Sequence, residues 1–321
     1  MSTEQKSEFT IELTAPDISA YKTGNRGIEY VTTFDSGVEG PHALVSAVVH
    51  GNELCGAIAV DHLFKQDVRP TRGKLSLAFM NVDAYHNFDP ANPMDSRYVE
   101  EDFNRVWAKD VLDGDRDSVE LRRARAVRPL IDEVDYLLDI HSMTITPEPL
   151  MMAGPIAKGR VIAKQVGLPE TVISDAGHKA GLRMRDYGDF INPDSHKNAL
   201  LMECGMHWVK ESGDLAIETA YRFLDVLGMI DPELAEKFGP KTLPQAQRFV
   251  ESSGPYTIKT DNFRFNEKFS GGEVFDKAGT VIAHDGDEPV TTPYDDCVLI
   301  MPNLRLRKDE SALRFGRLIE V

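Results

Sequence analysis

Three largely apolar runs, each leading into an ionisable side chain, constrain this sequence more than any other feature. Residues 43–49 read ALVSAVV and lead into His50, residues 136–141 read YLLDIH, and residues 199–203 read ALLME. Short apolar runs of this kind are typical of strands buried on both faces of a sheet. An ionised group at the end of such a strand is costly unless it is paired or coordinates an ion. The runs therefore predict buried strands whose polar ends meet at one edge of a sheet, where ligand sites form.

The rest of the first 230 residues predicts strands that alternate with helices. Further strands are expected at residues 29–33, 74–82, 150–153 and 171–174, and helices at residues 54–65, 120–134 and 212–230. This alternation predicts an α/β fold with a mostly parallel mixed sheet flanked by helices.

The pattern changes after Asp231-Pro232. From about residue 245, short β-rich pieces such as TIKT, EVFDKAGTVIAHD and CVLIMPN are separated by Gly, Asp and Pro turns. We therefore expect an α/β domain over residues 1–235, with an N-terminal extension over 1–30, and a smaller all-β domain over 240–321.

Composition excludes several classes of protein. A net charge of -16 argues against a nucleic-acid partner, because phosphate binding needs clustered Lys and Arg. No run approaches the roughly 18 apolar residues of a membrane span, and the polar start MSTEQKSEFT lacks the apolar core of a secretory signal. Three scattered cysteines do not suit a disulfide framework. We expect a cytoplasmic protein without a membrane partner; the oligomeric state stays open, a homo-oligomer included.

The segment His50-Gly51-Asn52-Glu53 predicts half of a metal site. A neutral imidazole and a carboxylate three residues apart can converge on one ion, with Gly51 allowing a sharp turn between them. Zinc prefers such nitrogen and oxygen ligands and needs a third from the protein. H-x-x-E alone is a weak signal, since a surface His beside a Glu is common. His141 and Glu203, at the ends of the other two runs, strengthen it.

Four motifs in order resemble the succinylglutamate desuccinylase and aspartoacylase family of the zinc carboxypeptidase group. They are HGNE, SRYVEEDFNR, DIHS and MECG, within about residues 43–210, and the likeness extends loosely to the β-rich end. The resemblance implies a zinc carboxypeptidase-like fold in which the β-rich domain covers the active-site entrance. It also implies one Zn²⁺ per chain, held by His50, Glu53 and His141. Phe103 stands where Leu is common in the family, a conservative difference.

The resemblance also implies roles for the other polar residues. Glu203 corresponds to the catalytic glutamate and Arg97 to the arginine that polarises the scissile carbonyl. Asn104 and Arg105 correspond to the pair that binds a substrate carboxylate, and Asp102 to the acid that orients a zinc-bound histidine. Tyr294, in a turn of the β-rich part, corresponds to a C-terminal tyrosine that reaches over the pocket to bind substrate. Glutamate as a proton carrier and arginine as an oxyanion or carboxylate partner suit amide hydrolysis.

The expected function is zinc-dependent hydrolysis of an N-acyl amino acid or a similar small amide that carries a carboxylate. A zinc carboxypeptidase acting on peptide C-termini is the alternative, and a non-catalytic metal-binding sensor of the same fold is a third. Residues 186–198 carry no arginine for a second substrate carboxylate, although Arg183 and Arg185 lie just before them. Either these two arginines take that role, or the substrate lacks a second carboxylate. The aspartates at 186, 189 and 194 would suit a cationic group instead.

Overall fold

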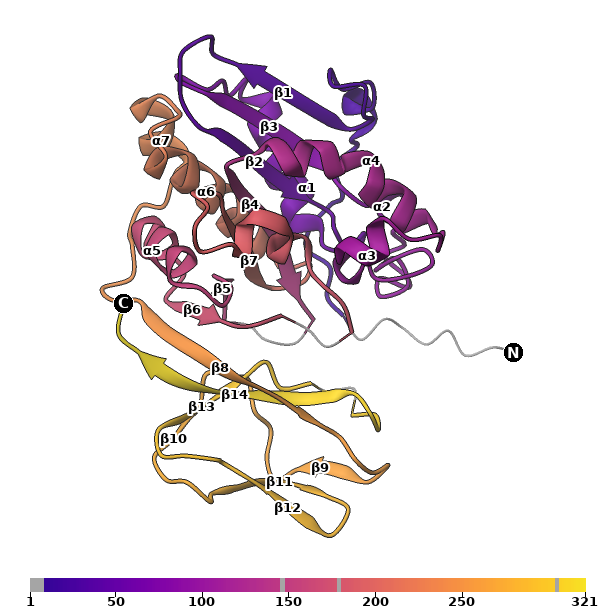
Figure 1. The fold of residues 1–321 in the computed structure, drawn as a ribbon, viewed down its shortest axis with the longest axis vertical. Coiled ribbons are helices and arrows are strands. Elements are labelled where there is room, and N and C mark those ends of the chain that lie inside the picture. The colour runs from indigo at the N-terminus through magenta and orange to yellow at the C-terminus, as the bar shows by residue number, and fades with distance from the viewer. Residues whose placement is uncertain (1–8, 145–147, 178–179, 304–305) are drawn as a thin grey trace.

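The computed structural model describes residues 9–144, 148–177, 180–303 and 306–321. Figure 1 shows a larger part, in which helices surround a sheet, above a narrower part made of strands. Eleven strands form one sheet in the order β1-β3-β2-β4-β7-β5-β6-β8-β14-β13-β10, and three more form a small sheet, β12-β11-β9. The expected mixed sheet with flanking helices and a smaller β-rich end is confirmed.

The strands are β1 (Val31–Asp35), β2 (His42–Ala47), β3 (Lys74–Phe79), β4 (Tyr136–Met143), β5 (Leu150–Met152), β6 (Thr171–Ser174), β7 (Asn198–Met206), β8 (Arg248–Thr257), β9 (Phe263–Phe265), β10 (Val274–Phe275), β11 (Val281–Asp285), β12 (Glu288–Thr291), β13 (Cys297–Ile300) and β14 (Ser311–Ile319). The helices are α1 (Leu54–Lys65), α2 (Val82–His86), α3 (Lys109–Leu112), α4 (Val119–Glu133), α5 (Ala157–Val166), α6 (Lys210–Val226) and α7 (Pro232–Phe238). In the described parts of the chain, no helix combines the length and apolar character that crossing a membrane requires.

The centre of the sheet is parallel and buried on both faces. Strands β3, β2, β4 and β7 pair in parallel. On β2, Val45 packs into the core shared with helices α1, α5 and α6, while Leu44 packs into the core shared with α4. All six residues of β2 are buried, which explains why this strand reads as a continuous apolar run.

Several elements differ from the sequence expectation. The strand expected to reach Val82 ends at Phe79, because the chain turns at Asn81 into the short helix α2. Asp231-Pro232, where the sequence pattern changes, begins a further helix. Asp231 accepts a hydrogen bond from the backbone N–H of Glu233 and caps α7, with Pro232 in the first turn. Helix α5 and strand β14 were not predicted.

The sheet runs on from the larger part into the β-rich part. Strand β8 pairs in parallel with β6, from Arg248 opposite Thr171 to Glu251 opposite Ser174, and antiparallel with β14 along its length. Figure 1 shows β8 and β14 crossing below the helical part. Backbone hydrogen bonds therefore join the two expected domains, and the β-rich part adds an apolar core of its own around Ile258, Phe263 and Ile282.

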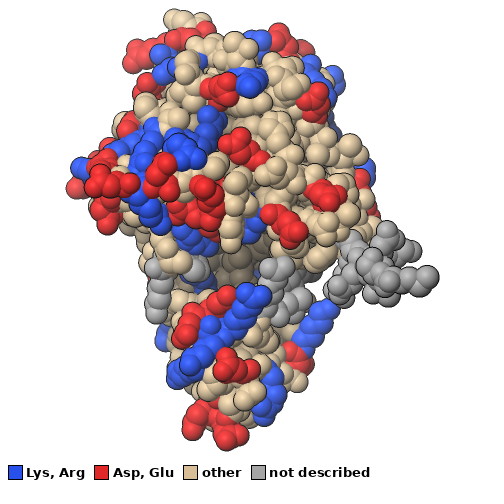
Figure 2. Space-filling view, turned by 90° about the vertical axis from the view of Figure 1, so that its right-hand side faces the viewer, with Lys and Arg blue, Asp and Glu red and all other residues tan. Residues whose placement is uncertain are grey.

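Figure 2 shows acidic and basic side chains interspersed over one face, so that neither charge covers it alone. The N-terminal extension packs against the body from its first described residues. The backbone N–H groups of Glu12 and Leu13 both donate to the carbonyl of Trp208, at 2.9 and 3.1 Å.

Candidate active site

Different strand lengths bring the predicted polar residues together. Strand β2 ends at Ala47, and its pairing with β4 stops at Ser46 opposite Asp139. Strands β4 and β7 continue, and place His141 directly opposite Glu203. His141 and Glu203 thus lie within the paired ends of their strands rather than after them. His50 and Glu53 come from the loop between β2 and α1.

Gly51 is needed for a different reason from the one expected. The left-handed conformation in this loop belongs to Val48, with φ of 54°. A Cβ atom on Gly51 would lie 2.3 Å from the carbonyl carbon of Ala84 and 2.5 Å from the carbonyl oxygen of Ser96. The glycine therefore allows the loop to lie directly against neighbouring backbone.

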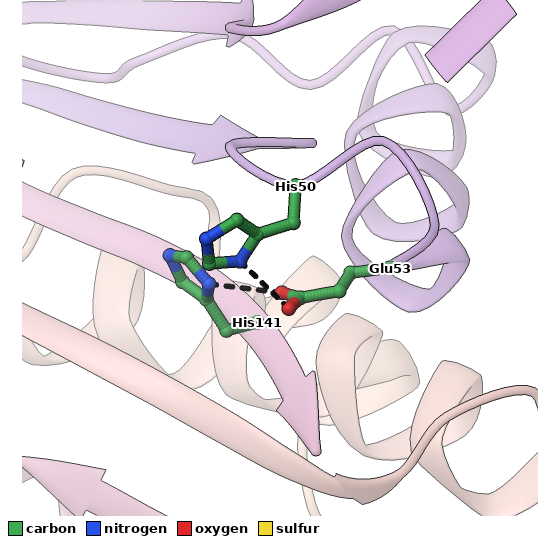
Figure 3. A group of neighbouring side chains, drawn as sticks. All are labelled: His50, Glu53 and His141. Carbon is green, nitrogen blue, oxygen red and sulfur yellow. Dashed lines mark hydrogen bonds and ion pairs between the residues drawn. The ribbon is translucent and has the colours of Figure 1, made fainter. Parts of the chain in front are cut away.

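His50, Glu53 and His141 form a buried group that can hold a metal ion. One ligand atom from each lies within 4.8 Å of the other two. Nδ1 of His50 is 2.8 Å from Oε1 of Glu53, and Nδ1 of His141 is 2.9 Å from Oε2. Figure 3 shows the two imidazoles approaching the same carboxylate. Burial alone would raise the pKa of Glu53, but the two histidines outweigh it and hold that pKa well below its usual value.

The remaining nitrogen of each imidazole faces a second carboxylate. Nε2 of His141 lies 2.8 Å from Asp139, which also accepts the hydroxyl of Ser46 at 2.7 Å. Nε2 of His50 lies 3.0 Å from Asp102. A carboxylate behind each imidazole orients the ring and favours the tautomer whose Nδ1 carries a lone pair. This arrangement fits a metal between the two Nδ1 atoms and Glu53.

Glu203, on strand β7, is partly exposed, and one of its oxygens is buried. Its Oε2 atom has no hydrogen-bond partner in the described structure, and the residue lines the cavity beside the metal-binding group. Burial raises the pKa of Glu203 to about 8. A carboxyl group with such a pKa can gain and lose a proton near neutral pH.

Arg97 lies between the histidine and its acid. Its Nη2 is 2.9 Å from Nε2 of His50 and 3.2 Å from Oδ2 of Asp102. When Nε2 of His50 carries its proton and donates to Asp102, it cannot also accept from Arg97. The guanidinium is then held by Asp102 and by Glu53, whose Oε1 lies 3.6 Å from Nη1 of Arg97. It is one third exposed and lines the same cavity.

Asn104 and Arg105 follow Asp102 in a short 3-10 helix, Phe103–Arg105. The side-chain oxygen of Asn104 accepts the backbone N–H of Met184 at 2.9 Å, so it also fixes the wall formed by residues 183–185. Arg105 donates to the carbonyl of Asn104 at 2.7 Å and lies 4.0 Å from Asp102. Burial lowers the pKa of Arg105, and most of its donors remain available to a ligand.

A cavity of about 290 Å³ is lined by the predicted metal ligands His50, Glu53 and His141 and by Arg97, Asn104, Arg105 and Glu203. Its other walls include two residues that sequence reasoning did not assign or left open, Arg314 from β14 and Arg183. Arg185 does not line it: its guanidinium pairs with Asp186 and donates to the carbonyls of Ala153 and Ala199.

Two further expectations do not match the geometry of this cavity. Tyr294 is not among its lining residues; the hydroxyl pairs with Ser253 at 2.8 Å and the ring with Arg317. The aspartates at 186, 189 and 194 do not line it either, because Asp186 is buried against Arg183 while the other two are exposed. Their positions give no support to a cationic substrate group.

His207, from the loop after β7, also faces the cavity. Its Nδ1 is 2.7 Å from the hydroxyl of Ser142, while Nε2 is buried without a partner in the described structure. Burial lowers the pKa of His207 to about 4, so the ring is neutral at physiological pH.

Some of the missed residues left a signal in the sequence and others did not. Asp139 stands two residues before His141, and alternate strand residues share a face, so their contact was open to prediction. Ser46 and Arg314 carry no local signal, because their partners are far away in the chain.

Comparison with known proteins shows to which family the chain belongs. A sequence model of the succinylglutamate desuccinylase/aspartoacylase catalytic domain matches residues 39–205, which are 167 of the 321 residues. No match is found among curated proteins.

Solved structures share the fold over most of the chain. A succinylglutamate desuccinylase from Vibrio parahaemolyticus has a TM-score of 0.64 at 17% identity, covering 91% of this chain and 87% of its own. An aspartoacylase family protein from Mesorhizobium loti has a TM-score of 0.60 at 19% identity, covering 91% and 89%. The ectoine utilization protein of Ruegeria pomeroyi has a TM-score of 0.61 at 17% identity, covering 89% and 88%. The chain belongs to the succinylglutamate desuccinylase/aspartoacylase family.

Proposed function

We propose that this protein is a zinc-dependent deacylase that hydrolyses the amide bond of a small N-acyl amino acid or a similar amide bearing a carboxylate. One observation carries the proposal: a His-Glu-His group that can hold a metal lines the same cavity as Glu203, whose buried Oε2 atom has no partner in the described structure. A cavity of about 290 Å³ suits a small amide better than a peptide, which disfavours the carboxypeptidase alternative.

The donor set supports zinc as the metal and one ion per chain. Two imidazole nitrogens and a carboxylate are the ligands of many catalytic zinc sites, which leave a fourth position open. Zinc at such a site supplies Lewis acidity, which polarises a carbonyl and lowers the pKa of water to roughly 7. His50, Glu53 and His141 are the residues that would hold it.

Glu203 is the proposed proton carrier. It takes a proton from the attacking water and delivers it to the leaving amine, a role that suits a carboxyl group whose pKa lies near the working pH. Arg97, released from His50 and anchored by Asp102, donates to the carbonyl oxygen as negative charge develops there.

Arg105 and Asn104 are the proposed partners of the substrate carboxylate. Arg105 has unused donors in a fork that matches a carboxylate, and its neighbour Asn104 holds that wall in place. Asp102 positions His50 from behind. Tyr294 would need to leave Ser253 and Arg317 to reach a substrate, so we give it no part in this mechanism.

The test is a screen of N-acyl amino acids and C-terminal peptides with the zinc-loaded protein and Glu203→Gln, with zinc content measured in parallel. We expect hydrolysis of N-acyl amino acids by the wild type and a loss on the order of 10²- to 10⁴-fold in the variant. Both proteins should bind about one zinc per chain. Undiminished turnover in Glu203→Gln would refute the role of Glu203. Activity in protein without bound metal would refute the zinc mechanism, and a zinc-loaded wild type that hydrolyses no amide would favour a sensor.

A further inference from the structure

Trp208, which follows the end of β7, joins the N-terminal extension to the body of the protein. Its carbonyl accepts the backbone N–H groups of both Glu12 and Leu13, and its ring packs edge-on against Phe9, with the ring centroids 5.2 Å apart. The carboxylate of Glu12 also accepts the backbone N–H of Lys210, the first residue of α6, at 2.8 Å. The extension therefore fixes the segment that leaves β7.

The indole of Trp208 reaches the turn that carries two of the proposed metal ligands. Its Nε1–H donates to the carbonyl of Asn52 at 2.8 Å. Asn52 stands between His50 and Glu53, and the backbone N–H of Glu53 donates to the carbonyl of His50 at 3.2 Å. Both polar atoms of the Asn52 side chain are buried without a partner in the described structure. The turn is therefore held at Asn52 by the indole and not by the side chain of the asparagine.

The backbone of Trp208 adopts a conformation that is rare for a bulky residue. Its φ of 64° lies in the left-handed region, and the residue is 1% exposed. Such a conformation costs free energy and persists only where the surrounding structure fixes it, as happens at functional sites. Here the N-terminal extension binds the carbonyl and Asn52 binds the indole. In this conformation His207 lines the cavity, while Trp208 beside it holds the turn that carries the ligands.

We propose that Trp208 is a positioning residue of the metal site, and that residues 9–13 of the N-terminal extension act on this site through it. The contacts of the extension keep the indole against Asn52, and the indole keeps the two ligands of the turn at the spacing that a metal ion requires. Trp208 and the extension lie outside residues 39–205, which match the catalytic-domain model of the family. The inference rests on the proposed zinc-dependent function and concerns how this chain builds the zinc site.

Trp208→Phe tests the contact between the indole and the turn. Phenylalanine keeps an aromatic ring and removes the N–H donor, which leaves the buried carbonyl of Asn52 without this partner. We expect zinc affinity to fall on the order of 10-fold, the size expected when a buried carbonyl loses its donor. Zinc binding should persist at this lower affinity, because the backbone N–H of Gly51 still donates to the carbonyl of Arg97 at 3.1 Å. The measurement is a zinc titration of metal-free protein in competition with a chelator.

Trp107→Phe is the matched control. Trp107 is the other of the two tryptophans in the chain; it is fully buried, and its indole N–H has no hydrogen-bond partner in the described structure. The same substitution therefore removes the same atoms without breaking a hydrogen bond, and zinc affinity should stay within about twofold of the wild type. Thermal unfolding of the metal-free proteins checks that both variants are folded.

The double variant Phe9→Ala, Glu12→Ala tests the extension. It removes the ring that packs on Trp208 and the carboxylate that binds Lys210, so zinc affinity should fall about threefold or more, a loss no larger than that of one hydrogen bond. Thr10→Ala, at an exposed position of the same segment, should leave zinc affinity unchanged. In the Trp208→Phe background, the double variant should cause little further loss of zinc affinity, because the hydrogen bond through which the extension acts is already absent.

The results distinguish a failure of this inference from a failure of the proposed function. A folded Trp208→Phe protein that binds zinc as tightly as the wild type would overturn the inference while the metal site stands. Equal losses from the Phe9→Ala, Glu12→Ala variant in the wild type and in Trp208→Phe would show that the extension is only structural. If Trp208→Phe does not fold, the double variant compared with Thr10→Ala decides, and equal zinc affinities of these two proteins would overturn the inference. A wild type that binds no zinc would refute the proposed function as well.

Discussion

Asp139→Asn tests whether the carboxylate behind His141 prepares this ring for a metal. Asp139 is fully buried; one oxygen lies 2.8 Å from Nε2 of His141 and the other accepts the hydroxyl of Ser46 at 2.7 Å. Asparagine has nearly the same shape, so the substitution changes charge and hydrogen bonding with little change in volume.

The amide has two orientations, and both weaken the site. With its oxygen toward His141, the correct tautomer survives but a charged hydrogen bond becomes a neutral one. A charged hydrogen bond contributes about 1.5–3 kcal/mol and a neutral one about 0.5–1.5 kcal/mol, so the substitution loses roughly 1 kcal/mol or somewhat more of interaction energy. With its nitrogen toward His141, Nε2 must accept, and Nδ1 then carries the proton where a metal lone pair is needed. We expect zinc affinity to fall about 10- to 100-fold, or about 1.4–2.7 kcal/mol.

The assay is a zinc titration of metal-free protein in competition with a chromophoric chelator. Thermal unfolding of the metal-free proteins checks that the variant is folded. Ser46→Ala, which keeps the acceptor for His141 and removes only its support, should have a smaller effect. A folded Asp139→Asn protein that binds zinc as tightly as the wild type would refute the reasoning.

Three further predictions follow from the site and the fold. Adding zinc to metal-free protein should raise the unfolding temperature by several degrees, since a ligand at 100 times its Kd adds about 2.7 kcal/mol to stability; the triple variant His50→Ala, Glu53→Ala, His141→Ala should show no such rise in a thermal scan. Gly51→Ala should lower zinc affinity, because its Cβ would lie 2.3 Å from the backbone of Ala84 and move the loop that carries two ligands; unchanged affinity would mean that the backbone gives way at no cost to the site. Burial lowers the pKa of His42 from 6.5 to about 4, so below pH 6.5 the unfolded chain takes up a proton that the folded chain does not, and stability falls as the pH drops toward 4. Urea unfolding at pH 7, 5 and 4 should show a smaller loss for His42→Gln than for the wild type. The control His284→Gln, on β11 and hydrogen-bonded to the neutral side chain of Asn266, should follow the wild type.

The parts of the site that lie at strand ends were predictable from the sequence, and the parts that depend on long-range packing were not. A buried parallel strand can be recognised in the sequence as an apolar run, so the polar residue that follows it, such as His50, marks the edge of the sheet. Arg314 gives no such sign. Its position follows from the pairing of β14 with β8 and of β8 with β6, and no local pattern reports which strands become neighbours.

The sequence predicted one of two helices well and missed the other. Helix α1 begins and ends where its apolar spacing predicts, at Leu54 and Lys65. Helix α5 was missed even though Gly167, with φ of 76°, closes it with the left-handed conformation usual after a helix. Only ten residues long, it alternates polar and apolar side chains too irregularly to stand out from a loop.

The backbone pairing of β6 with β8 has a consequence for the length of substrate that the cavity accepts. The metal-binding group belongs to the larger part and Arg314 to the β-rich part, yet one continuous ladder of hydrogen bonds sets the span between them. Such a ladder resists the hinge motion by which two loosely linked domains adjust to ligands of different size. In a homologous series of N-acyl amino acids, we therefore expect activity to peak at one chain length and to fall with each methylene added or removed.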